Sequence, residues 1–66
     1  MTDNPMRNRD VIFEFFPVGN VVRVSAMDVK TMTECSIQGP ASAGEAMLKA
    51  NALKRLEYVM KKKGLI

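Results

Sequence analysis

Few residues of this chain are able to do covalent chemistry. The sequence holds one cysteine, Cys35, and no histidine. Cys-His and Ser-His pairs need an imidazole beside the nucleophile, and one thiol without imidazoles cannot complete a four-ligand zinc site or close a disulfide within the chain. The sequence therefore predicts a protein with no catalytic residues, no metal and no cofactor. Cys35 is interpreted as a small, buried apolar side chain.

Two carboxylates offer an alternative chemistry. Glu14 and Glu34 could share a site as general acid and general base. The simpler interpretation of Glu14 is a cross-strand pair with Arg23, which would fix the alignment of two neighbouring strands.

The segment GPASAGE, residues 39–45, contains two glycines close to the expected start of a helix. Helix N-termini can bind phosphate through their free N–H groups, but the spacing fits neither of the usual phosphate-binding glycine motifs. Ser42 and Glu45 instead form the S-x-x-E pattern of a capping box, which would use those donors within the helix. We expect capping and no anion site.

Basic residues gather towards the C-terminus. They are Lys54, Arg55, Lys61, Lys62 and Lys63, with Tyr58 among them. Cations in the last turn of a helix complement its dipole and keep a small protein in solution. The same side chains could bind nucleic acid, with the lysines on phosphates and Tyr58 stacked on a base. The net charge of +3 is compatible with both interpretations.

These side chains must be positioned by few elements, because 66 residues make one domain at most. Residues 1–9 are polar and aperiodic and predict a mobile tail, and residues 10–66 predict a single domain. β-branched and aromatic residues predict strands over 11–16 and 21–27, and alternation predicts a third over 34–38. Between the first two, Pro17 to Asn20 predict a four-residue loop that places Phe16 opposite Val21.

The remainder of the chain predicts one amphipathic helix of about twenty residues, from Ser42 to a left-handed cap at Gly64. The fold class is therefore α+β, with a three-stranded antiparallel meander followed by one long C-terminal helix (βββα). Alignment of Val24 with Cys35 gives one wholly apolar sheet face for the helix. A helix of ~30 Å is longer than a six-residue strand of ~20 Å, so its end is expected to overhang the sheet.

The other sheet face is expected to be mixed, although a solvated face should be mostly polar. Together with the overhanging helix end, it predicts self-association into a homodimer or a larger oligomer. The candidate interface residues are Ile12, Phe16, Val21, Met27 and Met60.

No apolar run is long enough for a signal peptide or a membrane span. The sequence therefore predicts a cytoplasmic protein without a membrane partner.

Three segments carry a family resemblance: IFEFFPVGNVVRVSAMD, T-x-T-E-x-S-I-x-GPASA and LKRLEYVMKKKG. Over about residues 10–64 the chain resembles a small uncharacterised domain family of alphaproteobacteria, a domain of unknown function in which FFPVGN and GPASA are distinctive. The resemblance implies a bacterial cytoplasmic protein and assigns no activity or catalytic residue. The segment VKTMT departs from it, because the turn would more comfortably carry glycine in place of Met32.

The function predicted from the sequence is a small, non-catalytic protein-interaction module that self-associates. The alternative is a weak, electrostatically driven nucleic-acid-binding protein that uses the basic helix. An enzyme would need a site assembled across subunits from carboxylates and lysines.

Overall fold

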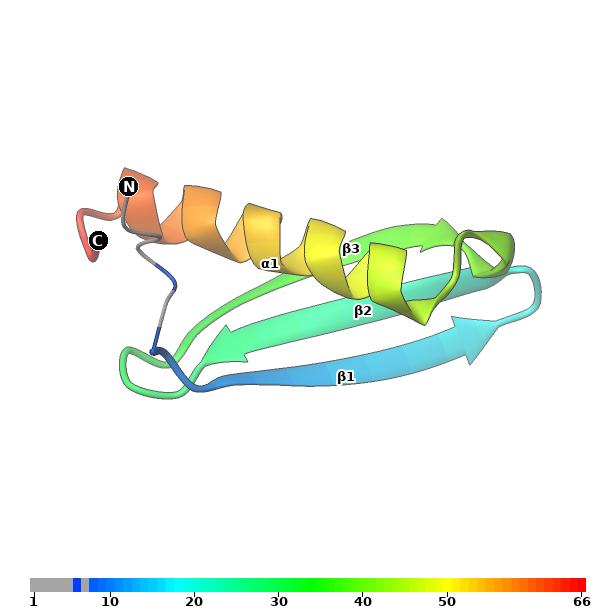
Figure 1. The fold of residues 1–66 in the computed structure, drawn as a ribbon, viewed down its shortest axis with the longest axis horizontal. Helices are drawn as coiled ribbons and strands as arrows, with labels where there is room; N and C mark the ends of the chain where they lie inside the picture. Colours follow the sequence, from blue (N-terminus) through cyan, green and yellow to red (C-terminus); the bar gives the residue numbers. More distant parts are fainter. Residues whose placement is uncertain (1–5, 7) are drawn as a thin grey trace.

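Three antiparallel strands and one C-terminal helix make up the fold, as the sequence predicts (Figure 1). The computed structural model describes residue 6 and residues 8–66. The strands are β1 (Val11–Val18), β2 (Val21–Asp28) and β3 (Thr33–Pro40), in the spatial order β1-β2-β3. A short 3₁₀ turn, η1 (Ala41–Ala43), leads into α1 (Glu45–Lys62). The predicted α+β class and βββα order are confirmed.

The hairpin between β1 and β2 is tighter than the sequence predicts. Gly19 and Asn20 alone form the loop, with Gly19 at φ 61°, as expected for the first central residue of a type II′ turn. Pro17 and Val18 therefore belong to β1, and the predicted four-residue loop is wrong. Proline is tolerated here because β1 lies at the edge of the sheet.

The tighter loop moves the pairing by two residues. Phe16 lies opposite Arg23 and Glu14 lies opposite Ser25, so the predicted alignment of Glu14 with Arg23 is wrong. The pairing of β2 with β3 differs by two residues as well, since Val24 lies opposite Ile37 and not Cys35. A shift of two leaves each side chain on its predicted face, because strand side chains alternate with period two.

The helix packs on one face of the sheet, mainly against β2 and β3, and β1 forms the sheet edge farther from the helix (Figure 1). Val24, Ala26, Leu48, Ala52 and Leu56 form the buried centre. The other apolar strand residues of this covered face pack against that centre; they are Val11, Phe13, Phe15, Val22, Cys35 and Ile37.

The start of the helix differs from the predicted capping box. Gly44, at φ 89°, is the N-cap residue, and no side chain caps the helix. Ser42 lies one turn earlier, in η1, because the chain makes a 3₁₀ turn before the helix begins. Glu45 is the first helical residue, where its charge complements the helix dipole.

The end of the helix agrees with the predicted glycine cap. Gly64 has φ 74°. Its N–H donates to the Lys61 carbonyl at 3.0 Å, and the Leu65 N–H donates to the Met60 carbonyl at 2.8 Å. These two bonds form a Schellman motif.

The predicted difference in length between helix and strands is wrong, because the strands have eight residues and α1 has 18, which makes both about 27 Å long. The C-terminal end of α1 still extends past the end of β2, on the side where the N-terminal segment lies (Figure 1). Met60 is fully buried, and Met6 and Ile66 pack in the same cluster. Met60 is therefore part of the core, and it is removed from the candidate interface.

The predicted mobile tail, residues 1–9, falls largely on residues 1–5 and 7, which lie outside the described residues. The rest of that segment is attached to the domain. Met6 is buried, and the Arg9 guanidinium lies 3.1 Å from the Asp28 carboxylate. Packing therefore begins before residue 10.

Candidate interaction site

The face of the sheet that the helix leaves open carries large apolar side chains. On this open face Ile12, Phe16 and Val21 are 49%, 45% and 42% exposed, and Met27 is half-buried. Four of the five predicted interface residues therefore share one surface. The open face also includes Val18, which is 73% exposed. The predicted interface does not include Val18, because the sequence predicts a loop at this position.

The apolar side chains lie at the two ends of the open face. Ile12 pairs with Met27 near the loop between β2 and β3, and Val18 pairs with Val21 beside the hairpin turn, with Phe16 one step away. Solvent-exposed apolar groups grouped in this way are typical of contact surfaces.

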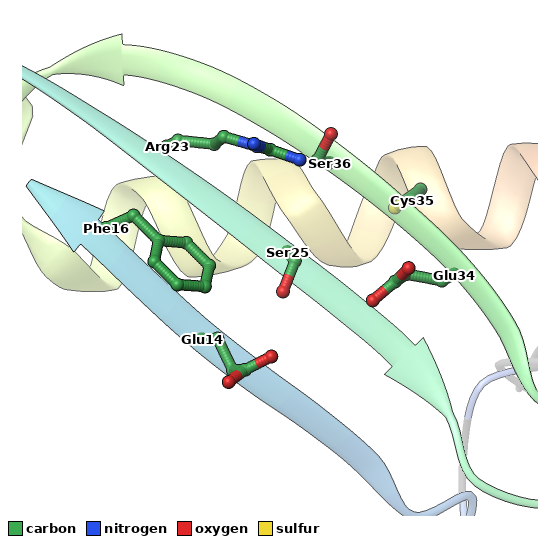
Figure 2. A pocket seen from close by; sticks show the side chains of 7 residues that line it. All are labelled: Glu14, Phe16, Arg23, Ser25, Glu34, Cys35 and Ser36. Atoms are coloured by element: carbon green, nitrogen blue, oxygen red, sulfur yellow. The ribbon is translucent and has the colours of Figure 1, made fainter.

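Between the two apolar ends lies a shallow polar hollow of about 250 Å³ (Figure 2). Its floor is Ser25 in the central strand, which is small and buried, and its register partners are Glu14 and Ser36. Figure 2 shows Arg23 extending over β3 towards Ser36, and Glu34 pointing back towards Ser25. The face thus holds two carboxylates and one guanidinium, which a second protein surface of mixed charge could match.

Glu14 and Glu34 line this hollow from the two outer strands. The hollow contains no histidine, because the chain has none. Its thiol neighbour, Cys35, has a side chain on the other face of the sheet (Figure 2). The hollow offers the hydroxyls of Ser25 and Ser36 and the carboxylates of Glu14 and Glu34 as polar contacts to a partner.

Cys35 lies on the covered face of the sheet, but it is half-buried and not fully buried as the sequence predicts. Its thiol donates to the Ala52 carbonyl of α1 at 3.5 Å. Burial raises the pKa of Cys35, an effect that the nearby Arg55 charge only partly offsets. The thiol is therefore protonated near neutral pH, which disfavours nucleophilic chemistry.

The basic residues of α1 lie on its exposed side. Arg55 and Lys62 place their charges 5.3 and 5.9 Å from the ring centre of Tyr58, within the range of cation–π interactions. Lys61 forms an ion pair with Glu57 at 3.6 Å. The structure thus brings Arg55, Tyr58 and Lys62 together, whereas Lys61 is partly neutralised. Lys54 and Lys63 are also exposed, but no contact joins them to this cluster.

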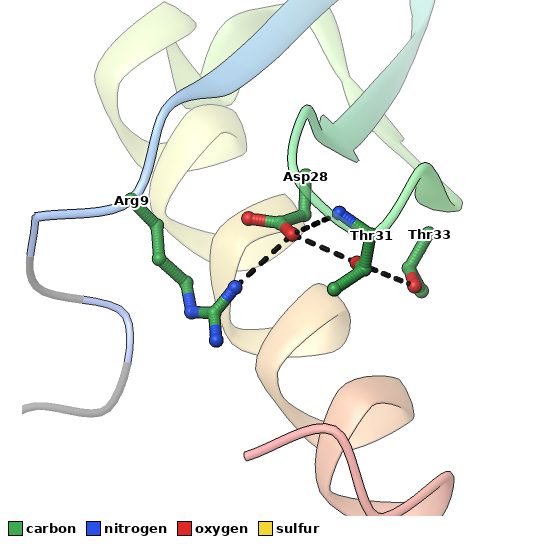
Figure 3. A network of polar contacts seen from close by, with 4 residues as sticks. All are labelled: Arg9, Asp28, Thr31 and Thr33. Atoms are coloured by element: carbon green, nitrogen blue, oxygen red, sulfur yellow. Dashed lines mark hydrogen bonds and ion pairs between the residues drawn. The ribbon is translucent and has the colours of Figure 1, made fainter.

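A buried polar network joins the N-terminal segment to the loop between β2 and β3 (Figure 3). One carboxylate oxygen of Asp28 accepts hydrogen bonds from the Thr31 amide at 3.0 Å, the Thr31 hydroxyl at 2.7 Å and Arg9 at 3.1 Å. The hydroxyls of Thr31 and Thr33 are 2.8 Å apart. The D-x-x-T spacing is the only sequence signal for this network, because a short polar side chain often binds the backbone of its own turn.

Burial acts to raise the pKa of Asp28, but the hydrogen bonds from Thr31 and the Arg9 charge outweigh it, so the pKa of Asp28 lies below its ordinary value. Asp28 is therefore ionised at neutral pH. It anchors a loop whose backbone is strained, since Met32 has φ 59°. The departure at Met32 noted in the sequence thus falls on a position that favours glycine.

Fold and site together define a small α+β domain with one helix-covered sheet face and one open sheet face. The chain belongs to the family described as a domain of unknown function (DUF6898), whose match spans residues 8–63. The predicted resemblance to a family of unknown function is confirmed. No curated protein and no solved structure matches the chain.

In the described part of the chain, no helix has both the length and the apolar character needed to cross a membrane. Within the same residues, no cluster of three or more His, Cys, Asp or Glu side chains is placed to hold a metal ion.

Proposed function

We propose that this protein is a small, non-catalytic interaction module that self-associates through the open face of its sheet. The observation that carries the proposal is the exposure of Ile12, Phe16, Val18 and Val21 on that one face. Two copies packed face to face would bury these side chains and place Arg23 of each copy near carboxylates of the other. The cytoplasmic location and the bacterial host stay predictions from the sequence.

The size of the molecule supports such a contact. A standard interface buries ~800 Å² on each partner, which is about a sixth of the 4814 Å² accessible surface. One broad face of a body measuring 36 × 27 × 19 Å can supply most of this area. A domain of this size also benefits from association, because its core alone gives little stability.

The proposal is tested by introducing one charge on the open face. We expect Phe16→Lys to halve the mass in solution measured by light scattering, because the lysine would be buried against the partner copy. The matched control is Tyr58→Lys, which places the same charge on a similarly exposed aromatic position of α1 and should leave the mass unchanged.

Circular dichroism checks that both variants keep the wild-type fold, and Phe16→Ala serves as a milder second variant. Equal masses for wild type and Phe16→Lys, with the fold retained, would contradict the proposed interface.

A second candidate function rests on the cluster of Arg55, Tyr58 and Lys62. An exposed aromatic ring flanked by cations is a common element of surfaces that bind single-stranded nucleic acid. Fluorescence anisotropy with a labelled single-stranded oligonucleotide should then show binding that weakens as salt increases and as Tyr58 is replaced by alanine. Absence of binding at low salt would remove this alternative.

A further inference from the structure

We propose that two copies also pair their β1 strands, antiparallel and about a two-fold axis at Phe13, to form a continuous six-stranded sheet. This inference rests on the proposed self-association, but it uses the edge of the sheet and not its open face.

The outer side of β1 is a free strand edge. No strand of the described chain lies beyond β1 in the sheet. The Val29 N–H donates to the Asp10 carbonyl at 3.0 Å, so the even-numbered positions of this strand direct their backbone groups towards β2. Because these directions alternate along a strand, the outward residues are Val11, Phe13, Phe15 and Pro17.

The outward groups of β1 are self-complementary in one register. With the axis at Phe13, Phe13 pairs with itself and Val11 pairs with Phe15 of the second copy, so each of the three both donates and accepts. The hydrogen-bond ladder between the two copies then ends at the pair of Pro17 and Arg9 on both sides of the axis. Pro17 has no N–H, and it would face Arg9, whose N–H already donates to the Met6 carbonyl at 3.4 Å.

Neighbouring registers are worse. An axis at Glu14 sets two carboxylates directly opposite each other, which destabilises a strand pair, and leaves the Val11 carbonyl facing Pro17. An axis at Ile12 pairs Phe15 with Arg9, whose N–H is not free. The register centred on Phe13 avoids both problems.

Side chains along the same edge favour this pairing. Val11 and Phe13 are half-buried beside a groove of about 430 Å³ between β1 and α1, which is also lined by Leu53 and Lys49. The Lys49 ammonium lies 4.9 Å from the ring centre of Phe13. A second β1 strand would extend the apolar surface of Phe13 and Phe15 and reduce the exposure of this groove to water.

The other edge of the sheet differs. By the same alternation, the residues of β3 whose backbone groups point outward are Glu34, Ser36, Gln38 and Pro40. The first three have polar side chains, and Pro40 has no backbone N–H to donate. Charged residues and proline are the usual means by which edge strands avoid pairing. Strand addition is therefore expected at β1 and not at β3.

Disulfide cross-linking between two different cysteine variants tests the register. In the proposed dimer Ile12 lies opposite Glu14 of the second copy as a pair without direct hydrogen bonds, at a Cα separation of ~4.5 Å, which lies within the range that a disulfide can span. Two chains are made in a Cys35→Ala background, one with Ile12→Cys and one with Glu14→Cys.

We expect an equimolar mixture of the two chains to form a covalent dimer under mild oxidation, with a yield about tenfold above that of either chain alone, because pairing raises the local thiol concentration. Adding Val11→Pro to both chains should lower the yield. It removes an outward N–H at the first residue of the strand and leaves the ladder with β2 intact.

The possible failures are distinguishable. If wild type is multimeric by light scattering but the mixture cross-links no better than the single chains, the edge pairing is overturned and the proposed function stands. Equal cross-linking by Glu14→Cys alone would place the axis at residue 14 and overturn the register. A monomeric wild type would overturn both proposals.

Discussion

Both faces of the sheet carry large apolar side chains, but the helix covers only one of them. On the covered face Val24, Ala26 and the helix residue Leu56 have no exposed surface, whereas on the open face Phe16 and Val18 are 45% and 73% exposed. The covered face therefore stabilises the monomer, and the open face has apolar area that the monomer does not use. Stability and association should respond to different substitutions.

The largest effect is expected in the covered face. Leu56 is fully buried between helix and sheet, and Leu56→Ala should lower the free energy of unfolding by about 2–5 kcal/mol through lost burial and a cavity. Urea denaturation at low protein concentration measures this. Phe16→Ala on the open face is the matched comparison, and a similar loss there would show that the two faces are not distinct.

A smaller effect is expected at the buried carboxylate at the end of the covered face. Asp28→Asn keeps one oxygen towards Thr31 but loses the charge that attracts Arg9, so we expect a loss of about 1.5–3 kcal/mol. Glu14→Gln on the open face should change stability little, since exposed charges of this kind contribute little. Thermal unfolding of both variants measures the two losses, and equal losses would contradict a stabilising role of the buried network.

Because of the Asp28 carboxylate, we expect the free energy of unfolding to depend on pH. The pKa of Asp28 is lower in the folded state than its ordinary value of 3.8, so on acidification the unfolded chain takes up the proton first. The stabilisation by ionised Asp28 is complete above that value and is lost as pH falls through the folded pKa. Asp28→Asn should lack this acid-dependent part in unfolding curves between neutral and acidic pH. An unchanged acid response would contradict the assignment.

The smallest effect is a gain in stability. Met32 holds a left-handed backbone conformation, φ 59°, with its side chain largely exposed. Met32→Gly should stabilise the domain by about 0.5–1 kcal/mol, since relief of the strain outweighs the added freedom of the unfolded chain. A higher melting temperature with unchanged mass would provide a firmer background for charge substitutions on the open face. A lower one would mean that the methionine side chain contributes packing.

Much of the fold follows from the sequence because the apolar pattern specifies faces more strongly than register. Pairing moved by two residues relative to the prediction, yet Phe13 stayed on the covered face and Phe16 on the open face. The difference arises at Pro17, which the sequence predicts to be a loop residue, although an edge strand accepts proline where the missing N–H points outward.

Two of the remaining differences concern contacts between residues that are distant in the chain. The sequence predicts that Met60 lies at an exposed helix end, but Met6 and Ile66 pack in the same cluster and help to bury it. The network of Arg9 and Asp28 joins residues 19 positions apart, and no local periodicity indicates such a pair. The predicted helix start differs for a local reason: a 3₁₀ turn precedes Gly44, and this turn leaves Ser42 away from the helical N–H groups.

Light scattering of wild type and Phe16→Lys over a dilution series, with Tyr58→Lys as control, tests the central claim most directly. Self-association through the open face predicts a wild-type mass that is a multiple of the chain mass, half that value for Phe16→Lys, and no change for Tyr58→Lys. A wild-type monomer at all concentrations would contradict the claim, as would a folded Phe16→Lys variant with the wild-type mass.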